Sequence, residues 1–370
     1  MDMELINGYL ILCMNDFSIN VYSATDYTFT SSFGERGHSD AFGLPQFLKS
    51  SSPYLYLIDV NNKNEIRKYQ IDSSGYVSLL QTCFAGINGS MNRPYIVGDS
   101  LIVYDEFIPE ASIKIHNLRT NAVELSLPYS TTSLDKRFLD KNMGGLYAND
   151  TCIAFVYKYQ DRIDFYNWQF NLVHSVNQQK SEPKIYPPKP FSNVLPKDNV
   201  LYYGSSYMGQ NYFYTLYRGV SFRVFRSDSI MINKQLDSYI YGLTRDVLEV
   251  YDYNGQPVCR FHFDDVSPAV FVVDEDQNRL IGYREVYRDS ILVYQLQGLP
   301  KNRKNYSKQT KPTLISSLPF ITKPENPEEV VCFKGLSMPY DVAPTFLVRY
   351  GGVDNRYFYA YIAWDPYIQK

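Results

Sequence analysis

The stretch that decides the fold is Leu248-Glu249-Val250-Tyr251-Asp252-Tyr253-Asn254-Gly255-Gln256-Pro257, which leads into the apolar run 258–263. Asn-Gly between two alternating apolar runs is the strongest short-range signal for a β-hairpin. The first four residues also follow a pattern that recurs along the chain: an aliphatic residue, any residue, an apolar or long residue, then Tyr or His. The stretch therefore predicts a hairpin and, through its repetition, a repeat architecture.

The recurring pattern occurs six times, and a strand-like run precedes each copy. The copies are Ile19–Tyr22, Ile66–Tyr69, Ile113–His116, Ile163–Tyr166, Leu248–Tyr251 and Ile291–Tyr294. Four of the five start-to-start intervals are 47, 47, 50 and 43 residues, which is the length of a propeller blade made of four short strands. The remaining interval of 85 residues holds either an insertion or a degenerate seventh blade between residues 180 and 245.

These intervals predict an all-β fold, namely a six-bladed β-propeller of four-stranded antiparallel blades over residues 1–298. The 35 Tyr and 22 Phe agree with this prediction, because aromatic side chains are enriched in strands. A β-sandwich is the alternative, but it does not account for the period. Residues 299–370 are expected to form a C-terminal tail or a small β appendage. The last unit lacks an outer strand, so we expect Met3–Ile6 or the tail to supply it.

Charge and hydropathy argue against two classes of partner. The net charge of −3 offers no general attraction for nucleic acid, and the basic residues between 301 and 311 fit a solvated linker. No apolar run approaches about 18 residues, so no membrane span is expected. The acidic N-terminus has no signal-peptide pattern.

The five Cys, at 13, 83, 152, 259 and 332, show no Cys-x-x-Cys spacing, so neither a disulfide framework nor a zinc site is indicated.

One linker adds a family resemblance. Phe33-Gly34-Glu35-Arg36-Gly37-His38-Ser39-Asp40-Ala41-Phe42-Gly43-Leu44-Pro45 resembles the Gly-rich linker of TolB-like and NHL-type six-bladed propellers, with Ser39-Asp40 where the family usually has Gly-Pro. The segment 211–219 resembles a second part of that family, and the resemblance covers roughly residues 5–297. Proteins of this kind are mostly uncharacterised envelope proteins. The resemblance therefore implies a propeller fold and a periplasmic or cell-envelope location, and it implies no particular reaction.

Catalytic motifs are missing from the sequence. It contains no dinucleotide or Walker loop, no His-Glu-x-x-His and no Gly-x-Ser-x-Gly, so no catalytic residue is predicted. The Gly-bounded loop offers instead Arg36, His38 and Asp40 as candidate ligand-binding residues, with Arg36 as an anion anchor. The alternative is an inter-blade linker whose charges are solvated.

An Asp stands near each hairpin that enters the repeated strand. These residues are Asp16, Asp59, Asp105, Asp161, Asp246 and Asp289. A ring of carboxylates near the mouth of a propeller could bind a cation such as Ca²⁺, with Asp59 and Asp105 as candidate ligands. The alternative is turn chemistry, because Asp accepts hydrogen bonds from the backbone of its own turn. Beyond this Ca²⁺ hypothesis no cofactor is predicted. The His residues at 116, 174 and 262 stand where other units have Tyr or Phe, and we interpret them as strand side chains.

The Tyr-rich run from Tyr202 to Tyr217 either lines a carbohydrate- or protein-binding surface or alternates as strands require. The repeat, the missing catalytic set and the Tyr content together predict a non-enzymatic binding module. It would recognise a protein or a glycan through loops at one end of the ring. The alternative function is a metal-dependent propeller hydrolase or lactonase that uses the Asp set and His38.

Overall fold

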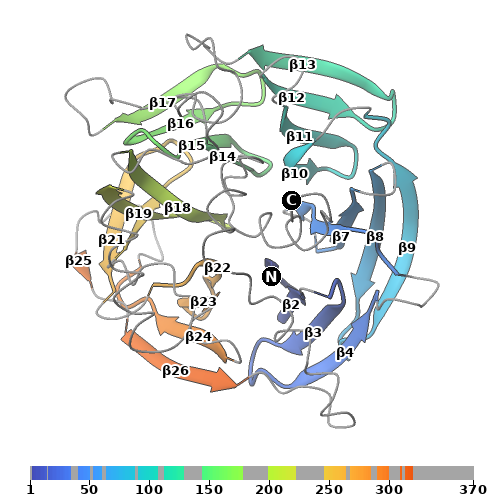
Figure 1. The fold of residues 1–370 in the computed structure, drawn as a ribbon, viewed down its shortest axis with the longest axis horizontal. Coiled ribbons are helices and arrows are strands. Elements are labelled where there is room, and N and C mark those ends of the chain that lie inside the picture. Colours follow the sequence, from blue (N-terminus) through green and yellow to red (C-terminus); the bar gives the residue numbers. More distant parts are fainter. Residues whose placement is uncertain are drawn as a thin grey trace, which may run out of the picture.

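The structure is a ring of six β-sheets (Figure 1). The computed structural model describes residues 2–14, 16–34, 41–50, 53–60, 64–87, 91–106, 112–128, 144–177, 199–221, 246–263, 267–284, 290–299, 309–310 and 313–319. Across these ranges every regular element is a β-strand, and none of them contains a helix long and apolar enough to cross a membrane. The predicted six-bladed, all-β propeller is confirmed.

The strands of each blade follow the chain order from the inner edge to the outer edge, and only β6 and β25 join a different blade. Blade 1 is β1 (Asp2–Ile6), β2 (Tyr9–Cys13), β3 (Ile19–Ser23) and β4 (Phe29–Phe33). Blade 2 is β5 (Pro45–Phe47), β7 (Leu55–Asp59), β8 (Glu65–Ile71) and β9 (Val77–Phe84). Blade 3 is β10 (Asn92–Val97), β11 (Leu101–Glu106), β12 (Ser112–Asn117) and β13 (Ala122–Pro128), with β6 (Lys49–Ser50) added in parallel to its inner edge.

Blades 4 to 6 complete the ring. Blade 4 is β14 (Gly144–Ala148), β15 (Ile153–Tyr157), β16 (Arg162–Tyr166) and β17 (Leu172–Asn177). Blade 5 is β18 (Val200–Met208), β19 (Phe213–Ser221), β20 (Val247–Tyr251) and β21 (Pro257–His262), with β25 (Gln309–Thr310) added in parallel to its outer edge. Blade 6 is β22 (Val270–Asp274), β23 (Arg279–Tyr283), β24 (Ser290–Gln295) and β26 (Thr313–Pro319).

The sequence repeat coincides with the third strand of every blade. In all six blades the register between the third and fourth strands shifts at the final residue of the repeat. These residues are Tyr22, Tyr69, His116, Tyr166, Tyr251 and Tyr294. Each shift inserts one extra residue in the outer strand, which is a β-bulge that twists and bends that strand. The six aromatic positions are therefore equivalent around the ring, as the repeat predicts.

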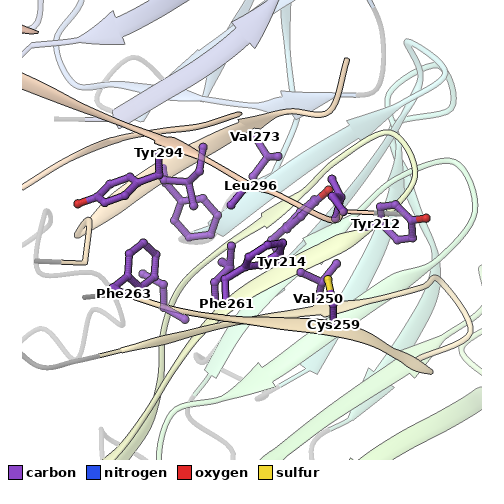
Figure 2. Close-up of a cluster of buried hydrophobic side chains, with 14 of the residues drawn as sticks. Tyr212, Tyr214, Val250, Cys259, Phe261, Phe263, Val273, Tyr294 and Leu296 are labelled. Carbon is purple, nitrogen blue, oxygen red and sulfur yellow. The ribbon is translucent and has the colours of Figure 1, made fainter. Parts of the chain in front are cut away.

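The hydrophobic core is divided into six clusters, one in each space between adjacent blades. Alternation along the third strand sends the repeat's Tyr towards the preceding blade and the residue before it towards the following blade. Tyr251 thus packs with Phe165 of blade 4, while Val250 packs with Val273 of blade 6. Figure 2 shows side chains of blades 5 and 6 gathered in one such cluster. A single sheet could not bury both of its faces, so the ring is the unit that folds.

Ring closure uses packing between the first and last blades. The inner strands β1 and β22 lie against each other, and Met3 and Val272 share a core cluster there. The outer strand of blade 6 is β26, so the expectation that a terminal segment completes the last blade is confirmed for the C-terminal segment. The ring therefore continues past residue 298 as far as Pro319. Met3–Ile6 belongs instead to the inner strand of blade 1.

The long interval in the repeat holds no seventh blade within the described part of the chain. The strands β18 and β19 of this interval are the two inner strands of blade 5. The excess length lies in two connections, residues 178–199 before β18 and residues 222–246 after β19. The predicted Asn254-Gly255 hairpin is confirmed, because β20 pairs with β21 and Asp252 accepts hydrogen bonds from the Asn254 and Gln256 amides at 2.9 Å.

Candidate functional site

The antiparallel order gives the ring two different ends. In each blade the first-to-second and third-to-fourth strand turns lie at one end, which we call the hairpin face. The second-to-third connections and the blade-to-blade connections lie at the other end, which we call the linker face. This assignment follows from strand order alone, because successive antiparallel strands run in opposite directions.

The connections on the two faces differ in length. Most hairpin-face turns are short, such as residues 7–8, 98–100, 118–121 and 209–212, and the exceptions are 48–54 and 296–312, which contain β6 and β25. The linker face carries the connections 129–143, 178–199 and 222–246, besides 34–44. Long connections on a rigid scaffold are where binding residues concentrate. The linker face is therefore the candidate functional site.

Asp59 anchors one of these connections at its base. It is the last residue of β7 and is only 2% exposed. Its carboxylate accepts hydrogen bonds from the backbone amides of Gly43 at 2.7 Å and Leu44 at 2.9 Å. Both amides belong to the connection 34–44, so the charge of Asp59 fixes where this connection enters blade 2. A ligand role for Asp59 stays a prediction, and it would require these amides to be displaced.

A second carboxylate joins blades 5 and 6 at the linker face. Asp246, directly before β20, accepts hydrogen bonds from Arg218 Nε at 3.3 Å and from the Ser267 hydroxyl at 2.8 Å. Ser267 lies in the connection between the two blades, and its Oγ also accepts a hydrogen bond from Arg284 at 2.9 Å. Buried charges need such partners, because an unpaired one carries a large desolvation cost. This chain of polar groups holds the connection 263–269 against the ring.

A third carboxylate joins blades 4 and 5. The Tyr203 hydroxyl of β18 donates to Asp161 Oδ1 at 3.0 Å, across the boundary between the two blades. Burial raises the pKa of Asp161 above its ordinary value, although this hydrogen bond and the nearby Arg260 act in the opposite direction. In contrast, Asp16 accepts from Ser18 of its own turn at 3.0 Å and 2.7 Å. Asp16 thus serves its own turn, whereas Asp59, Asp161 and Asp246 bind a linker or a neighbouring blade.

A cation of β6, at the inner edge of blade 3, meets the acidic inner strand of blade 1. The Lys49 ammonium lies 2.8 Å from Glu4 Oε2 and 3.6 Å from Asp2 Oδ1, and it donates to the Met3 carbonyl. Burial raises the pKa of Glu4, and the ammonium opposes that change. No local pattern in the sequence pairs these residues, because the contact joins inner strands of two blades. Sequence reasoning missed it for that reason.

The remaining predicted site residues are placed as follows. Asp105 is fully buried in β11, opposite Ile113, in the blade next to that of Asp59. Arg36, His38 and Asp40 lie outside the described residues, as does Asp289. Where the structure describes the chain, no group of three or more His, Cys, Asp or Glu side chains could hold a metal ion. The Ca²⁺ hypothesis and the hydrolase alternative therefore stay predictions that depend on Arg36–Asp40 and their neighbours.

The Tyr-rich run divides between two environments. Tyr203, Tyr212 and Tyr214 are buried in the cores beside blade 5. Tyr202 and Tyr217 are partly exposed, and their rings lie tilted against each other with centroids 6.5 Å apart. Strand alternation thus accounts for most of these residues, and only the partly exposed ones keep a surface for a ligand.

Comparisons with known proteins give little information on the fold beyond the chain's own topology. No family model matches the chain, and no curated protein matches it. Among solved structures the chain is similar to the Pan2 WD40 domain of Neurospora crassa, with 11% identity and a TM-score of 0.41. That match covers 85% of this chain and 78% of the other. The propeller fold is shown by the six sheets themselves.

Proposed function

We propose that this protein is a non-enzymatic binding module that recognises a protein or a glycan through the linker face. The contrast in connection length between the two faces carries this proposal. The connections 129–143, 178–199 and 222–246 all leave from the linker face, and they are much longer than the hairpin-face turns 7–8 or 98–100. Propellers often serve as binding scaffolds, and a ring with short protected edges tolerates long loops at one end.

Buried polar contacts fix two further connections of the linker face, 34–44 and 263–269, and this supports the proposal. Asp59 holds the connection 34–44, and Asp246 with Ser267 holds the connection 263–269. Fixing the base of a loop reduces the conformational entropy that a ligand has to overcome on binding. Arg36, His38 and Asp40 belong by sequence to the connection 34–44, so we propose that they contribute to recognition. The TolB-like or NHL-type kinship and an envelope location are part of the same proposal.

The test uses two probes, a glycan array and a peptide-display library. Binding by the wild type is compared with two linker-face variants: Arg36→Ala/His38→Ala/Asp40→Ala, and a chain with residues 226–242 replaced by a short Gly-Ser linker. The matched control is Arg119→Ala/Thr120→Ala in an exposed hairpin-face turn. We expect at least one linker-face variant to bind about tenfold more weakly, which is about 1.4 kcal/mol, and the control to bind like the wild type. Binding that is absent in the wild type, or lost only in the control, contradicts the proposal.

A further inference from the structure

The outer strands of three consecutive blades expose large apolar side chains. They are Leu79, Leu80 and Phe84 of β9, Val123 and Leu125 of β13, and Leu172 and Val173 of β17. Figure 1 shows these three strands following one another around the outside of the ring. Contiguous apolar surface on a soluble domain usually marks an interaction site. We call these residues the rim patch.

The β-bulges explain why neighbouring residues are exposed together. In β9 the register passes from Lys68↔Gln81 to Tyr69↔Leu79, so Leu80 is the extra residue of the bulge. Strict alternation would turn one of two successive side chains towards a neighbouring blade. The bulge leaves both Leu79 and Leu80 in solvent, with 54% and 48% of their surface exposed. The equivalent bulge in β17 leaves Leu172 52% exposed and Val173 50% exposed.

The rim of blade 5 shows what covers an outer edge in this protein. There β25 pairs in parallel with β21, through Arg260↔Gln309 and Phe261↔Thr310. Val258, the extra residue of the bulge in β21, is 3% exposed, whereas its counterparts Leu80 and Val173 are 48% and 50% exposed. The covering strand comes from the segment between β24 and β26, and β26 then forms the fourth, outer strand of blade 6. The chain after β24 therefore contributes the outermost strands of blades 5 and 6.

Among the outer strands of the rim patch, β9 is best suited to accept another strand. It is the longest of the three, eight residues from Val77 to Phe84, and it contains no charged side chain. Phe84 is 57% exposed, and Tyr76 directly before the strand is 66% exposed. By contrast, β13 carries Glu124 at its bulge. An edge strand that is long, apolar and uncharged is the kind that pairs with a further strand.

The sequence beyond Pro319 contains a segment that matches this edge. Residues 357–364 read Tyr-Phe-Tyr-Ala-Tyr-Ile-Ala-Trp, eight residues without a charge and rich in aromatic side chains. Burying the apolar side chains of such a run is favourable, and its residue types favour a β-strand. Residues 320–356 can span up to about 120 Å when extended, at about 3.3 Å per residue. A domain of this length has a radius of gyration of about 20 Å, so the rim of blade 2 is within reach.

We propose that residues 357–364 dock on the outer edge of blade 2, over β9, and cover Leu79, Leu80 and Phe84. This repeats on blade 2 the mode of cover that β25 establishes on the outer strand of blade 5. The interaction is intramolecular, so the linking residues keep the segment at a high effective concentration near its site. It is independent of the linker face and of any ligand bound there.

The test uses the full chain and its two Trp residues, Trp168 and Trp364. Trp168→Phe leaves Trp364 as the only indole, and its emission and its quenching by acrylamide report whether it is shielded from water. Leu79→Glu/Leu80→Glu is compared with Leu172→Glu/Val173→Glu, which changes residues of almost equal exposure at the equivalent bulge of blade 4. We expect the blade 2 pair to shift Trp364 emission to longer wavelength and to raise quenching severalfold, while the blade 4 pair changes neither.

A second measurement identifies the covering segment directly. A photo-crosslinking residue at position 80 should link to residues 357–364 within the monomer, as shown by peptide mass spectrometry. Links formed only in a dimer band, with strength that rises with protein concentration, would mean that a second copy covers β9 and would overturn the proposal. Equal quenching of Trp364 in all variants would overturn it as well. Circular dichroism melts confirm that each variant is folded.

Discussion

The two faces of the ring are built on different principles. Turns on the hairpin face are short, and several of them contact the neighbouring blade directly. The Tyr9 hydroxyl of blade 1 donates to Ser73 in a turn of blade 2 at 2.9 Å, and Lys68 of blade 2 pairs with Asp99 in a turn of blade 3 at 2.6 Å. On the linker face, buried groups such as Asp59 hold the bases of connections whose lengths vary widely.

This difference indicates where stability and recognition can change independently. A hairpin-face turn is fixed on two sides, by its own hairpin and by the adjacent blade, so a small change there is felt by both blades. For a long connection, loop-closure entropy depends only weakly on the number of residues. Substitutions at hairpin-face contacts between blades should therefore alter the free energy of unfolding, and changes within linker-face connections should alter binding.

The largest effect is expected at Gly75, in the turn between β8 and β9. It has φ +80°, and a Cβ there would overlap the Thr30 methyl group of blade 1 and lie 2.8 Å from Tyr9 Cε1. Gly75→Ala should lower the free energy of unfolding by about 2–5 kcal/mol, the sum of left-handed backbone strain and overpacking. Denaturant unfolding measures the change.

The matched control is Gly8→Ala, at φ +79° in the hairpin turn of blade 1, where a Cβ would meet nothing within 4 Å. Gly8→Ala should lower the free energy of unfolding only by the left-handed backbone strain, about 1–2 kcal/mol. Equal losses in the two variants would show that the Gly75 turn does not depend on contact between blades, and the comparison of the two faces would lose its main support.

The next largest loss of stability is expected on substitution of Arg279 of blade 6. This substitution tests whether contacts between the last and first blades stabilise the closed ring. Its guanidinium donates to the Ala24 carbonyl and the Tyr27 hydroxyl of blade 1, both at 3.1 Å, and to Asp274 at 2.7 Å. Arg279→Met keeps the apolar stem but leaves Asp274 without this partner. We expect a loss of about 2–4 kcal/mol, because one partner of a partly buried charge pair is removed.

The control for Arg279 is Arg119→Met, which removes the same charge from an exposed turn of blade 3. It should change the free energy of unfolding by about 0.5 kcal/mol or less. Thermal melts of the three proteins separate the two outcomes. If both Arg variants melt together with the wild type, the contact between blades 6 and 1 does not contribute to closure.

A smaller, pH-dependent effect is expected at Glu275, in the turn between β22 and β23. Its carboxylate accepts from the Asn211 amide at 2.9 Å, the Tyr212 amide at 3.2 Å and the Tyr214 hydroxyl at 3.0 Å. Glu275→Gln replaces one acceptor oxygen by an amide donor that faces these donors. The variant should lose about 1–3 kcal/mol.

Burial raises the folded-state pKa of Glu275 above its ordinary value of 4.5. Ionisation is therefore less favourable in the folded protein than in the unfolded chain, and the group's contribution to stability increases as the pH falls through the folded pKa towards 4.5. The wild type should accordingly gain stability relative to Glu275→Gln as the pH is lowered from neutrality. A difference in melting temperature that stays constant or shrinks on acidification would contradict this assignment.

The smallest effect on stability is expected on the linker face. Replacing residues 226–242 by a short Gly-Ser linker shortens the connection between β19 and β20. Loop-closure entropy changes by about 1 kcal/mol or less for such a shortening. Denaturant unfolding should therefore give nearly the wild-type free energy. Loss of cooperative unfolding would show that this segment is part of the ring's core, and the linker face would not be a separate recognition surface.

Much of the fold follows from local sequence. The repeat predicted six blades, and all six copies became third strands with a bulge at the same residue. The Asn254-Gly255 turn formed as expected between β20 and β21. These features depend on short-range alternation and turn chemistry, which a linear pattern records directly.

The candidate site followed from sequence only in part. The recurring Asp residues were found by their spacing, but the spacing did not show that Asp59 would receive two linker amides while Asp16 would serve its own turn. Arg36, His38 and Asp40 lie outside the described residues, so their role stays a prediction. A carboxylate's partners depend on which connection passes over it, and the spacing between residues does not specify that path.

By itself, the sequence determined the six copies of the repeated strand and the demand for an additional outer strand in blade 6, but it left a seventh blade between residues 180 and 245 open. Only the tertiary structure decided which segment supplied that strand, how Arg279 reaches the Ala24 carbonyl, and how Lys49 meets Glu4. The physical reason is separation along the chain. Alternation and turns act over a few residues, whereas ring closure and axial charge pairs form between segments that approach each other only when all six blades are in place.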